Sequence, residues 1–289
     1  MQRRLIGSVV VVAAGLLPAV IGGPVFALLM FGLGAVALQE FVALGRAKAP
    51  PAARWCLAAG LALTGVGALL RQPLVLFAAI LIGAVVSLVT YLPLTGTPGS
   101  AEAWAWGVAG FGYVGLPVFA AVALRQADGQ AAAPGWQQLT ERLSLGWAPA
   151  AAGMAWVLAV VLSTWAGDSA AYLAGRALGR HKLAPLVSPG KTIEGSLGGL
   201  LAATVVSAAV FSLSGVLPLW AGALIGLVIG ISGQAGDLSE SFLKRQAGVK
   251  DSGDLIPGHG GMLDRIDALL FAFPAAWLAH GIVAGGALW

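Results

Sequence analysis

Residues 216–237 read VLPLWAGALIGLVIGISGQAGD, an apolar run that ends on the carboxylate of Asp237. A helix needs about 20 mostly apolar residues to cross the hydrocarbon core of a bilayer, and this run has that length. Gly222, Gly226 and Gly230 recur at every fourth position, a spacing at which small residues let a neighbouring helix approach closely. The stretch therefore predicts a membrane-spanning helix, packed on its glycine face, with a charged residue directly at its end.

Apolar runs of this kind occur along the whole chain, at residues 5–21, 24–45, 55–70, 73–92, 104–124, 148–167, 195–214, 216–235 and 268–288. Of the 289 residues 58% are hydrophobic and 10% are charged, whereas a soluble domain has about 45–50% apolar and about 25% charged residues. No soluble fold could cover so much apolar surface. We therefore predict an all-α, polytopic integral membrane protein with nine transmembrane helices, or eight if one of the short first and third runs does not cross.

The positions of the basic residues predict the orientation of these spans. With nine spans and a cytoplasmic N-terminus, Arg71, Arg125 and Arg142 fall outside and the other 13 of the 16 Lys and Arg residues fall on the cytoplasmic side. Positive charge accumulates in cytoplasmic loops, so this orientation is favoured. The same distribution accounts for the pI near 9.6 without nucleic-acid binding, because the basic residues are spread among apolar spans.

Charge is concentrated in two polar segments of the second half, residues 168–194 and 236–267, which carry 16 of the 28 charged residues. We divide the chain into residues 1–147, with spans one to five and an outer loop, and residues 148–289, with spans six to nine and both polar segments on the cytoplasmic side. Among the first five spans the single acid is Glu40. We interpret Glu40 as a helix-end residue at the membrane interface rather than as a functional carboxylate.

The later polar segment combines acids, bases and glycines at the ends of spans. From Asp237 onward the spacing predicts a helix that carries Asp237, Ser241 and Lys244 on one face. Gly260 and Gly261 precede a further helix, where backbone N–H groups can approach an anion closely. Carboxylates hold Mg²⁺, while Lys and Arg neutralise phosphate oxygens. The pattern therefore predicts phosphoryl or nucleotidyl transfer to a polyanion.

The earlier polar segment has the same character. The stretch from Asp168 to Arg176 predicts a helical continuation of the sixth span. Ser188 and Lys191 stand just before the seventh span, where they can bind phosphate at a helix N-terminus. Thr192 and Glu194 also suit the first turn of that helix, so capping and phosphate binding both remain open.

The order of these residues resembles the signature of the phosphatidate cytidylyltransferases, also called CDP-diacylglycerol synthases. The matching positions are Asp168-Ser-x-x-Tyr172-x-x-Gly175-Arg176, Ser188-Pro-x-Lys191-Thr-x-Glu194-Gly195, Gly236-Asp237, Ser241-Phe-Leu-Lys-Arg245, Lys250-Asp251 and Pro257-x-His259-Gly260-Gly261-x-x-Asp264-Arg265-x-Asp267. These motifs cover about the last 125 residues. The first half is similar to the family only as a run of membrane helices.

The resemblance implies Mg²⁺-dependent transfer of the cytidylyl group from CTP to phosphatidic acid, giving CDP-diacylglycerol and pyrophosphate. It makes Asp237 and Asp264 the expected metal ligands and implies a second metal such as K⁺. The expected catalytic residues are Asp168, Lys191, Asp237, Lys244, Arg245, Lys250, Asp251, His259, Asp264, Arg265 and Asp267. The expected substrate-binding residues are Ser188, Lys191, Thr192, Ser241, Lys244, Arg245, Lys250, Gly260, Gly261 and Arg265. For His259 a phosphate-contacting or proton-handling role and a helix-turn hydrogen bond both remain open.

The resemblance also implies the surroundings in which the protein works. CTP, phosphatidic acid and membrane lipids are the expected partners, nucleic acid is not, and the glycine faces are compatible with a homodimer. The expected location is the inner membrane of a bacterium, with the site facing the cytoplasm. The nearest alternative is a related enzyme with another lipid acceptor, either a CTP-dependent polyprenol kinase or an archaeal-lipid cytidylyltransferase. A secondary transporter is more remote, because its charges typically lie near the membrane midplane.

Overall fold

The computed structural model describes residues 16–45, 49–128, 132–144, 151–254 and 260–285. In this part of the chain eight helical segments are long and apolar enough to cross a membrane, which confirms the all-α, polytopic membrane fold. They are α2 (Gly23–Leu44), α3 (Pro51–Leu70), the run Pro73–Leu94, α6 (Ser100–Arg125), α8 (Ala151–Leu178), α9 (Ile193–Ser214), α10 (Leu219–Gln246) and α11 (Leu263–Val283). The first of the nine predicted spans, residues 5–21, lies mostly outside the described residues.

The third of these segments is not one regular helix. It consists of α4 (Pro73–Ile80), a π-helical turn η1 (Leu81–Val86), the short α5 (Ser87–Val89) and a 3₁₀ turn η2 (Leu92–Leu94). By contrast, α8 and α10 are continuous over 28 residues each and extend past the apolar runs that predicted them. Their last turns carry Asp168 to Arg176 and Asp237 to Arg245. Both stretches are therefore helical, as their spacing predicted.

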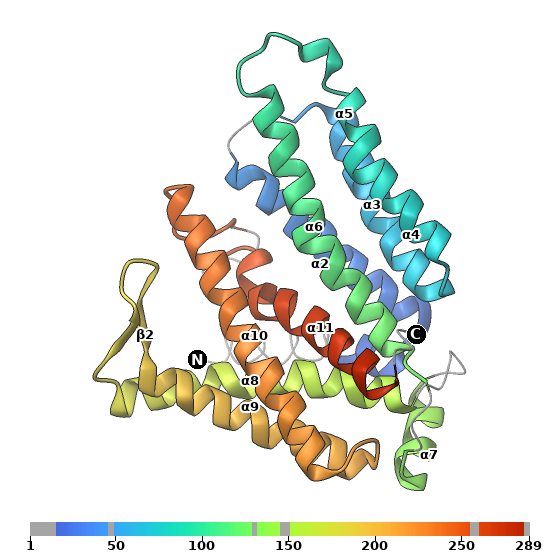
Figure 1. Ribbon diagram of the computed structural model, residues 1–289, viewed down its shortest axis with the longest axis vertical. Coiled ribbons are helices and arrows are strands. Elements are labelled where there is room, and N and C mark those ends of the chain that lie inside the picture. Colours follow the sequence, from blue (N-terminus) through green and yellow to red (C-terminus); the bar gives the residue numbers. More distant parts are fainter. Residues whose placement is uncertain (1–15, 46–48, 129–131, 145–150, 255–259, 286–289) are drawn as a thin grey trace.

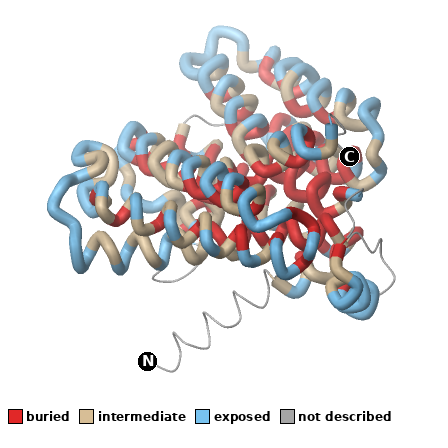
Figure 2. The backbone as a smooth tube through the Cα atoms, turned by 60° about the horizontal axis from the view of Figure 1, so that its bottom comes forward, coloured by how far each residue is buried: buried red, intermediate tan, exposed pale blue. Residues whose placement is uncertain are grey.

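The helices form two groups that share one core. Figure 1 shows α2, α3, α4 and α6 gathered at one end of the molecule and α8, α9 and α10 at the other, with α11 between them. Helix α11 packs against both α6 and α10. At the centre the fully buried ring of Trp156 on α8 meets Phe211 of α9 and His280 of α11 edge to face, with ring centroids 4.8 and 5.3 Å apart. Figure 2 shows the buried residues concentrated in the interior of the molecule, with exposed residues around its periphery.

The glycine face of α10 packs against α9, as its spacing predicted. A Cβ atom added at Gly226 would lie 2.7 Å from both Ser207 Cβ and Thr204 Cα. The equivalent atoms at Gly222 and Gly230 would also lie against α9. These close approaches bring the two helix axes together without side chains between them.

A short hairpin, absent from the all-α prediction, joins α8 to α9. Its strands β1 (Lys182–Ala184) and β2 (Ser188–Thr192) are antiparallel, with Lys182 opposite Thr192 and Ala184 opposite Ser188. Thr192 ends the hairpin and is the N-cap of α9, because its Oγ1 accepts a hydrogen bond from Gly195 N at 3.1 Å. Capping was one of the two roles left open for this threonine, and the bond confirms it.

The opposite end of the bundle holds the arginines that were predicted to lie outside. Arg71 forms an ion pair with Asp128, in the segment that follows α6. Arg125, only 1% exposed, donates from Nε to Ala19 O at 2.7 Å and from an Nη atom to Val20 O at 2.8 Å. Arg125 thereby ties the end of α6 to the chain that precedes α2. The predicted outer loop contains a further short helix, α7 (Pro134–Leu143).

Candidate active site

The two predicted polar segments meet at one end of the bundle. Lys191 of β2 forms an ion pair with Asp237 of α10. Arg245, near the end of α10, donates from Nε to Val187 O in the hairpin at 3.4 Å. The hairpin therefore lies against the last turns of α10, and two segments about 45 residues apart in sequence contribute to one site.

Three carboxylates from three helices form what we call the acidic cluster: Asp168 of α8, Asp237 of α10 and Asp267 of α11. Asp168 and Asp267 each interact electrostatically with Asp237 and with Lys191. The cluster and Lys191 together carry three negative charges and one positive charge when all are ionised. The side chains of Lys191 and Asp237 are 27% and 30% exposed, so the cluster is open to a polar ligand. Such an excess of negative charge suits a divalent cation.

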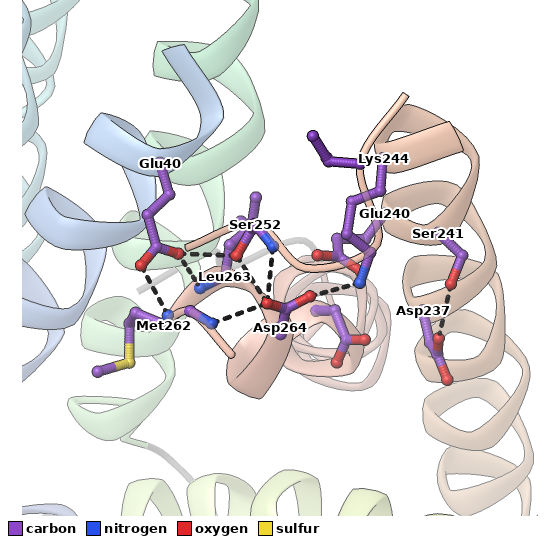
Figure 3. Close-up of polar contacts among 12 residues, drawn as sticks. Glu40, Asp237, Glu240, Ser241, Lys244, Ser252, Met262, Leu263 and Asp264 are labelled. Carbon is purple, nitrogen blue, oxygen red and sulfur yellow. Dashed lines mark hydrogen bonds and ion pairs between the residues drawn. The ribbon is translucent and has the colours of Figure 1, made fainter. Parts of the chain in front are cut away.

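A second group of charges lies deeper and is centred on Lys244. Its ammonium forms ion pairs with Glu240 of α10 and with Asp264 of α11. The Glu240 side chain is fully buried and those of Lys244 and Asp264 are about one tenth exposed. Figure 3 shows the contact of Lys244 with Asp264, and Glu240 beside Lys244 on α10. Sequence analysis missed Glu240, although an acid four residues before a lysine on a helix is a recognisable ion-pair spacing.

The loop before α11 binds the carboxylate of Asp264. One oxygen, Oδ2, accepts hydrogen bonds from Gly261 N at 2.8 Å and from Ser252 N at 2.9 Å, and it lies 2.9 Å from the Ser252 hydroxyl. The other oxygen, Oδ1, faces Lys244. Gly260 has a φ of 80°, a conformation that L side chains rarely adopt, and this turn directs the following N–H groups toward the carboxylate.

The N–H groups that follow Gly260, where an anion was expected to bind, have acceptors within the protein in this structure. The Gly261 N–H donates to Asp264, and the N–H groups of Met262 and Leu263 donate to Glu40. The first N–H groups of a helix lack partners within the helix, and here carboxylates of the protein itself supply them. At these three positions carboxylates of the protein lie at the helix N-terminus, and phosphate binding by Gly260 and Gly261 stays a prediction.

Glu40 was interpreted as a helix-end residue at the membrane interface, and its contacts show that this was incomplete. Its carboxylate on α2 accepts from Met262 N at 2.9 Å and from Leu263 N at 2.7 Å. It also lies 2.9 Å from the Ser252 hydroxyl. Glu40 is the single acid of the first five predicted spans. This was the signal that could have identified it, because an acid in a membrane span is costly without a partner.

The two predicted metal ligands have different partners in the structure. Asp237 pairs with Lys191 and lies 3.5 Å from the Ser241 hydroxyl, whereas Asp264 is engaged by Lys244 and by the loop before α11. Within the described residues no three Asp, Glu, His or Cys side chains are grouped as a complete metal site. Mg²⁺ commonly takes one or two carboxylates and fills its remaining positions with water and phosphate oxygens. Asp237 in the acidic cluster and the Oδ1 atom of Asp264 have the chemistry for that role.

The remaining predicted site residues differ in exposure. Arg245, Lys250, Asp251 and Arg265 are exposed, Ser188 and Gly260 are partly buried, and Thr192 is buried. The Thr192 hydroxyl is used in capping α9, and Arg245 also donates to Val249 O at 3.0 Å. His259 lies outside the described residues. Glu194, predicted for the first turn of α9, lies beside the hairpin and accepts from the backbone N–H groups of Arg180 and His181.

Comparison with known proteins identifies a family. Phosphatidate cytidylyltransferases of Staphylococcus haemolyticus and Staphylococcus aureus are 46% and 44% identical to this chain over 123 residues, which is 42% of this chain and 47% of each relative. The chain thus spans about half the length of the curated relatives that it matches. The Cytidylyltransferase family matches residues 2–283, nearly the whole chain. This protein therefore belongs to the cytidylyltransferase family.

Proposed function

We propose that this protein transfers the cytidylyl group of CTP to phosphatidic acid, giving CDP-diacylglycerol and pyrophosphate for phospholipid biosynthesis. The observation that carries the proposal is the meeting of the acidic cluster with Lys191 at the end of a membrane bundle. Both substrates are polyanions, so catalysis depends on cations that neutralise phosphate and on carboxylates that hold a metal. Family membership and the names of the relatives support the same reaction.

In this reaction an oxygen of the lipid phosphate attacks the α-phosphorus of CTP, and the bond from that phosphorus to the bridging oxygen of the β-phosphate breaks. Pyrophosphate leaves, so no nucleophile of the protein and no covalent intermediate are needed. Lys191 and Lys244 bind phosphate oxygens and hold the two substrates in line. Exposed Arg245, Lys250 and Arg265 add positive charge for the triphosphate.

We assign Mg²⁺ to Asp237 and Asp264. When bound, Mg²⁺ neutralises phosphate charge and makes the α-phosphorus more electrophilic. The acidic cluster supports Asp237, because Lys191 balances only one of its three charges. One oxygen of Asp264 is held by the loop and the other faces a cation, at present Lys244, which supports Asp264. We also propose that a second metal such as K⁺ takes part.

An apolar pocket beside α10 suits the acyl tails of the lipid. It has a volume of about 460 Å³ and is lined by Phe41, Tyr113, Leu238, Phe242 and neighbouring residues of α6 and α10. Its α10 residues occupy the turns that also carry Asp237 and Lys244. A lipid whose tails enter this pocket from the membrane would bring its phosphate to the same end of α10.

The proposed location is the cytoplasmic membrane of a bacterium, with the site on the cytoplasmic side. The 13 basic residues on the side of the polar segments support this orientation, and the bacterial relatives support the compartment. Soluble CTP reaches the acidic cluster only from that side. We also propose a homodimer, which crosslinking in native membranes tests.

Labelled CTP distinguishes the proposed reaction from its nearest alternative. With purified protein, phosphatidic acid and Mg²⁺ in detergent micelles, label in the α-phosphate moves to the lipid, and label in the γ-phosphate appears in pyrophosphate. A polyprenol kinase would transfer the γ-label to a lipid instead. An archaeal-lipid cytidylyltransferase would use the α-label but require another acceptor. Absence of α-label in the lipid with phosphatidic acid, in protein that remains folded, would refute the proposal, as would turnover unaffected by chelation of Mg²⁺.

A further inference from the structure

Glu40 connects the first helix group to the loop that holds Asp264. Helix α2, which carries Glu40, belongs to the group formed by α2, α3, α4 and α6, whereas the loop and α11 follow the catalytic helix α10 (Figure 1). Glu40 is more than 200 residues from Met262 and Leu263, yet its two carboxylate oxygens accept one hydrogen bond from each of their backbone N–H groups. Both bonds are shorter than 3 Å. They fix the first turn of α11 against α2.

Ser252 connects Glu40 to Asp264 directly. Its hydroxyl oxygen lies 2.9 Å from Oε2 of Glu40 and 2.9 Å from Oδ2 of Asp264, and the dashed lines of Figure 3 follow this path. The hydroxyl has one proton, so it donates to one carboxylate at a time. The Ser252 N–H donates to Asp264 throughout. Displacement of Glu40 would therefore remove one partner of the Ser252 hydroxyl and weaken the support that this serine gives to Asp264.

Two glycines of the loop lie directly against the Glu40 carboxylate. A Cβ atom at Gly261 would collide with the Ser252 hydroxyl and with the Glu40 carboxylate. A Cβ atom at Gly253 would lie 2.8 Å from Oε1 of Glu40. Two glycines of the polar segment thus provide the space that the Glu40 carboxylate occupies. Hydrogen bonds and close backbone contacts together hold this carboxylate in place, which is the environment of a residue that sets a geometry.

We propose that Glu40 is a positioning residue for the active site: it holds the first turn of α11 and Ser252 so that Oδ1 of Asp264 faces the cation that neutralises substrate phosphate. Glu40 itself has no contact with Lys244, Lys191 or Asp237 among the interactions of the described residues, so it acts through Asp264. The catalytic consequence of this inference rests on the proposed function. The structural part, the fixing of α11, does not depend on any activity.

Amide hydrogen exchange tests the structural part in purified protein without substrate. The N–H groups of Met262 and Leu263 stand at the start of α11, where a helix offers them no internal partner, so their protection comes from Glu40. We expect Glu40→Ala to speed their exchange by about tenfold or more, and Glu40→Gln to do so less, because an amide retains one acceptor oxygen. The matched control is Glu102→Gln, an exposed glutamate in the first turn of α6. Exchange equal to wild type in both Glu40 variants would overturn the tether.

Turnover against Mg²⁺ concentration tests the catalytic part. In Glu40→Gln we expect kcat to fall by about a hundredfold, the order of loss when a reacting group moves by about 1 Å. We also expect the Mg²⁺ concentration for half-maximal turnover to rise severalfold, which a smaller folded fraction would not cause. Ser252→Ala should raise the same Mg²⁺ requirement while leaving the amides of Met262 and Leu263 protected.

The outcomes of these experiments distinguish failure of the proposed function from failure of the positioning role of Glu40. Wild-type protein that does not transfer cytidylyl groups refutes the proposed function, and the exchange experiment still decides the tether. If wild type is active, Glu40→Gln with unchanged kcat refutes positioning. A lower kcat with an unchanged Mg²⁺ requirement in both Glu40→Gln and Ser252→Ala refutes the route through Asp264.

Discussion

Replacing Lys244 by methionine should destabilise the folded protein more than the same replacement at Lys191. Lys244 is 11% exposed and is the cation between Glu240 and Asp264, which are 0% and 10% exposed. Methionine keeps most of the length of the side chain but leaves two buried carboxylates without a cation. Breaking a buried ion pair from one side costs about 3–5 kcal/mol. At about 2–4 °C per kcal/mol, the midpoint of thermal unfolding should fall by roughly 6–20 °C.

Lys191→Met is the matched control, because Lys191 also pairs with one carboxylate of the site but is 27% exposed. Ion pairs that water reaches contribute about 0–1 kcal/mol, so its midpoint should fall by no more than about 4 °C. Both variants should lose turnover, since both lysines bind phosphate in the proposed reaction. The assay is tryptophan fluorescence during heating in detergent at one scan rate, since membrane proteins often unfold irreversibly.

A third variant tests the cause of the loss at Lys244. Adding Glu240→Gln to Lys244→Met removes one of the two uncompensated charges, so it should restore part of the midpoint. Neighbouring residues of one ion-pair network are expected to be non-additive in this way. Equal midpoints for Lys244→Met and Lys191→Met would refute the reasoning from burial. No recovery in the double variant would show that packing, rather than charge, accounts for the difference.

Three further predictions concern separate parts of the structure. Asp237→Asn should abolish Mg²⁺-dependent turnover while keeping the thermal midpoint within a few degrees, because it also relieves repulsion in the acidic cluster; a large loss of stability would contradict this. Gly261→Ala should remove most turnover through collision with Ser252 and Glu40, whereas Gly112→Ala, whose added methyl group meets no atom, should match wild type in the same assay. Arg125→Met should lower the thermal midpoint, because the carbonyls of residues 19 and 20 lose the hydrogen bonds from its guanidinium, at a cost of about 1–3 kcal/mol for the buried Ala19 carbonyl. The KM for CTP should stay unchanged in the protein that remains folded.

The sequence by itself determined the membrane fold, eight of the spans and the membership of both polar segments in one site. These properties follow from local patterns, since the length of an apolar run and the clustering of charge can be read without knowing which residues touch. Helix continuation through Asp168 and Asp237 and the cap at Thr192 were predictable for the same reason. The hairpin of β1 and β2 was not, because its strands are too short to show an alternating pattern.

The tertiary structure alone decided which carboxylates share a partner. Asp168, Asp237 and Asp267 converge because the last turns of α8 and α10 lie against the first turns of α11. By contrast Asp264, only three residues before Asp267, turns to Lys244 and the loop. Glu40 meets α11 across 223 positions of sequence, a contact that no local pattern encodes. The anion at the start of α11 is therefore a side chain of a distant helix. The physical reason for this contact is that buried N–H groups must find an acceptor, and the fold brings a carboxylate to them.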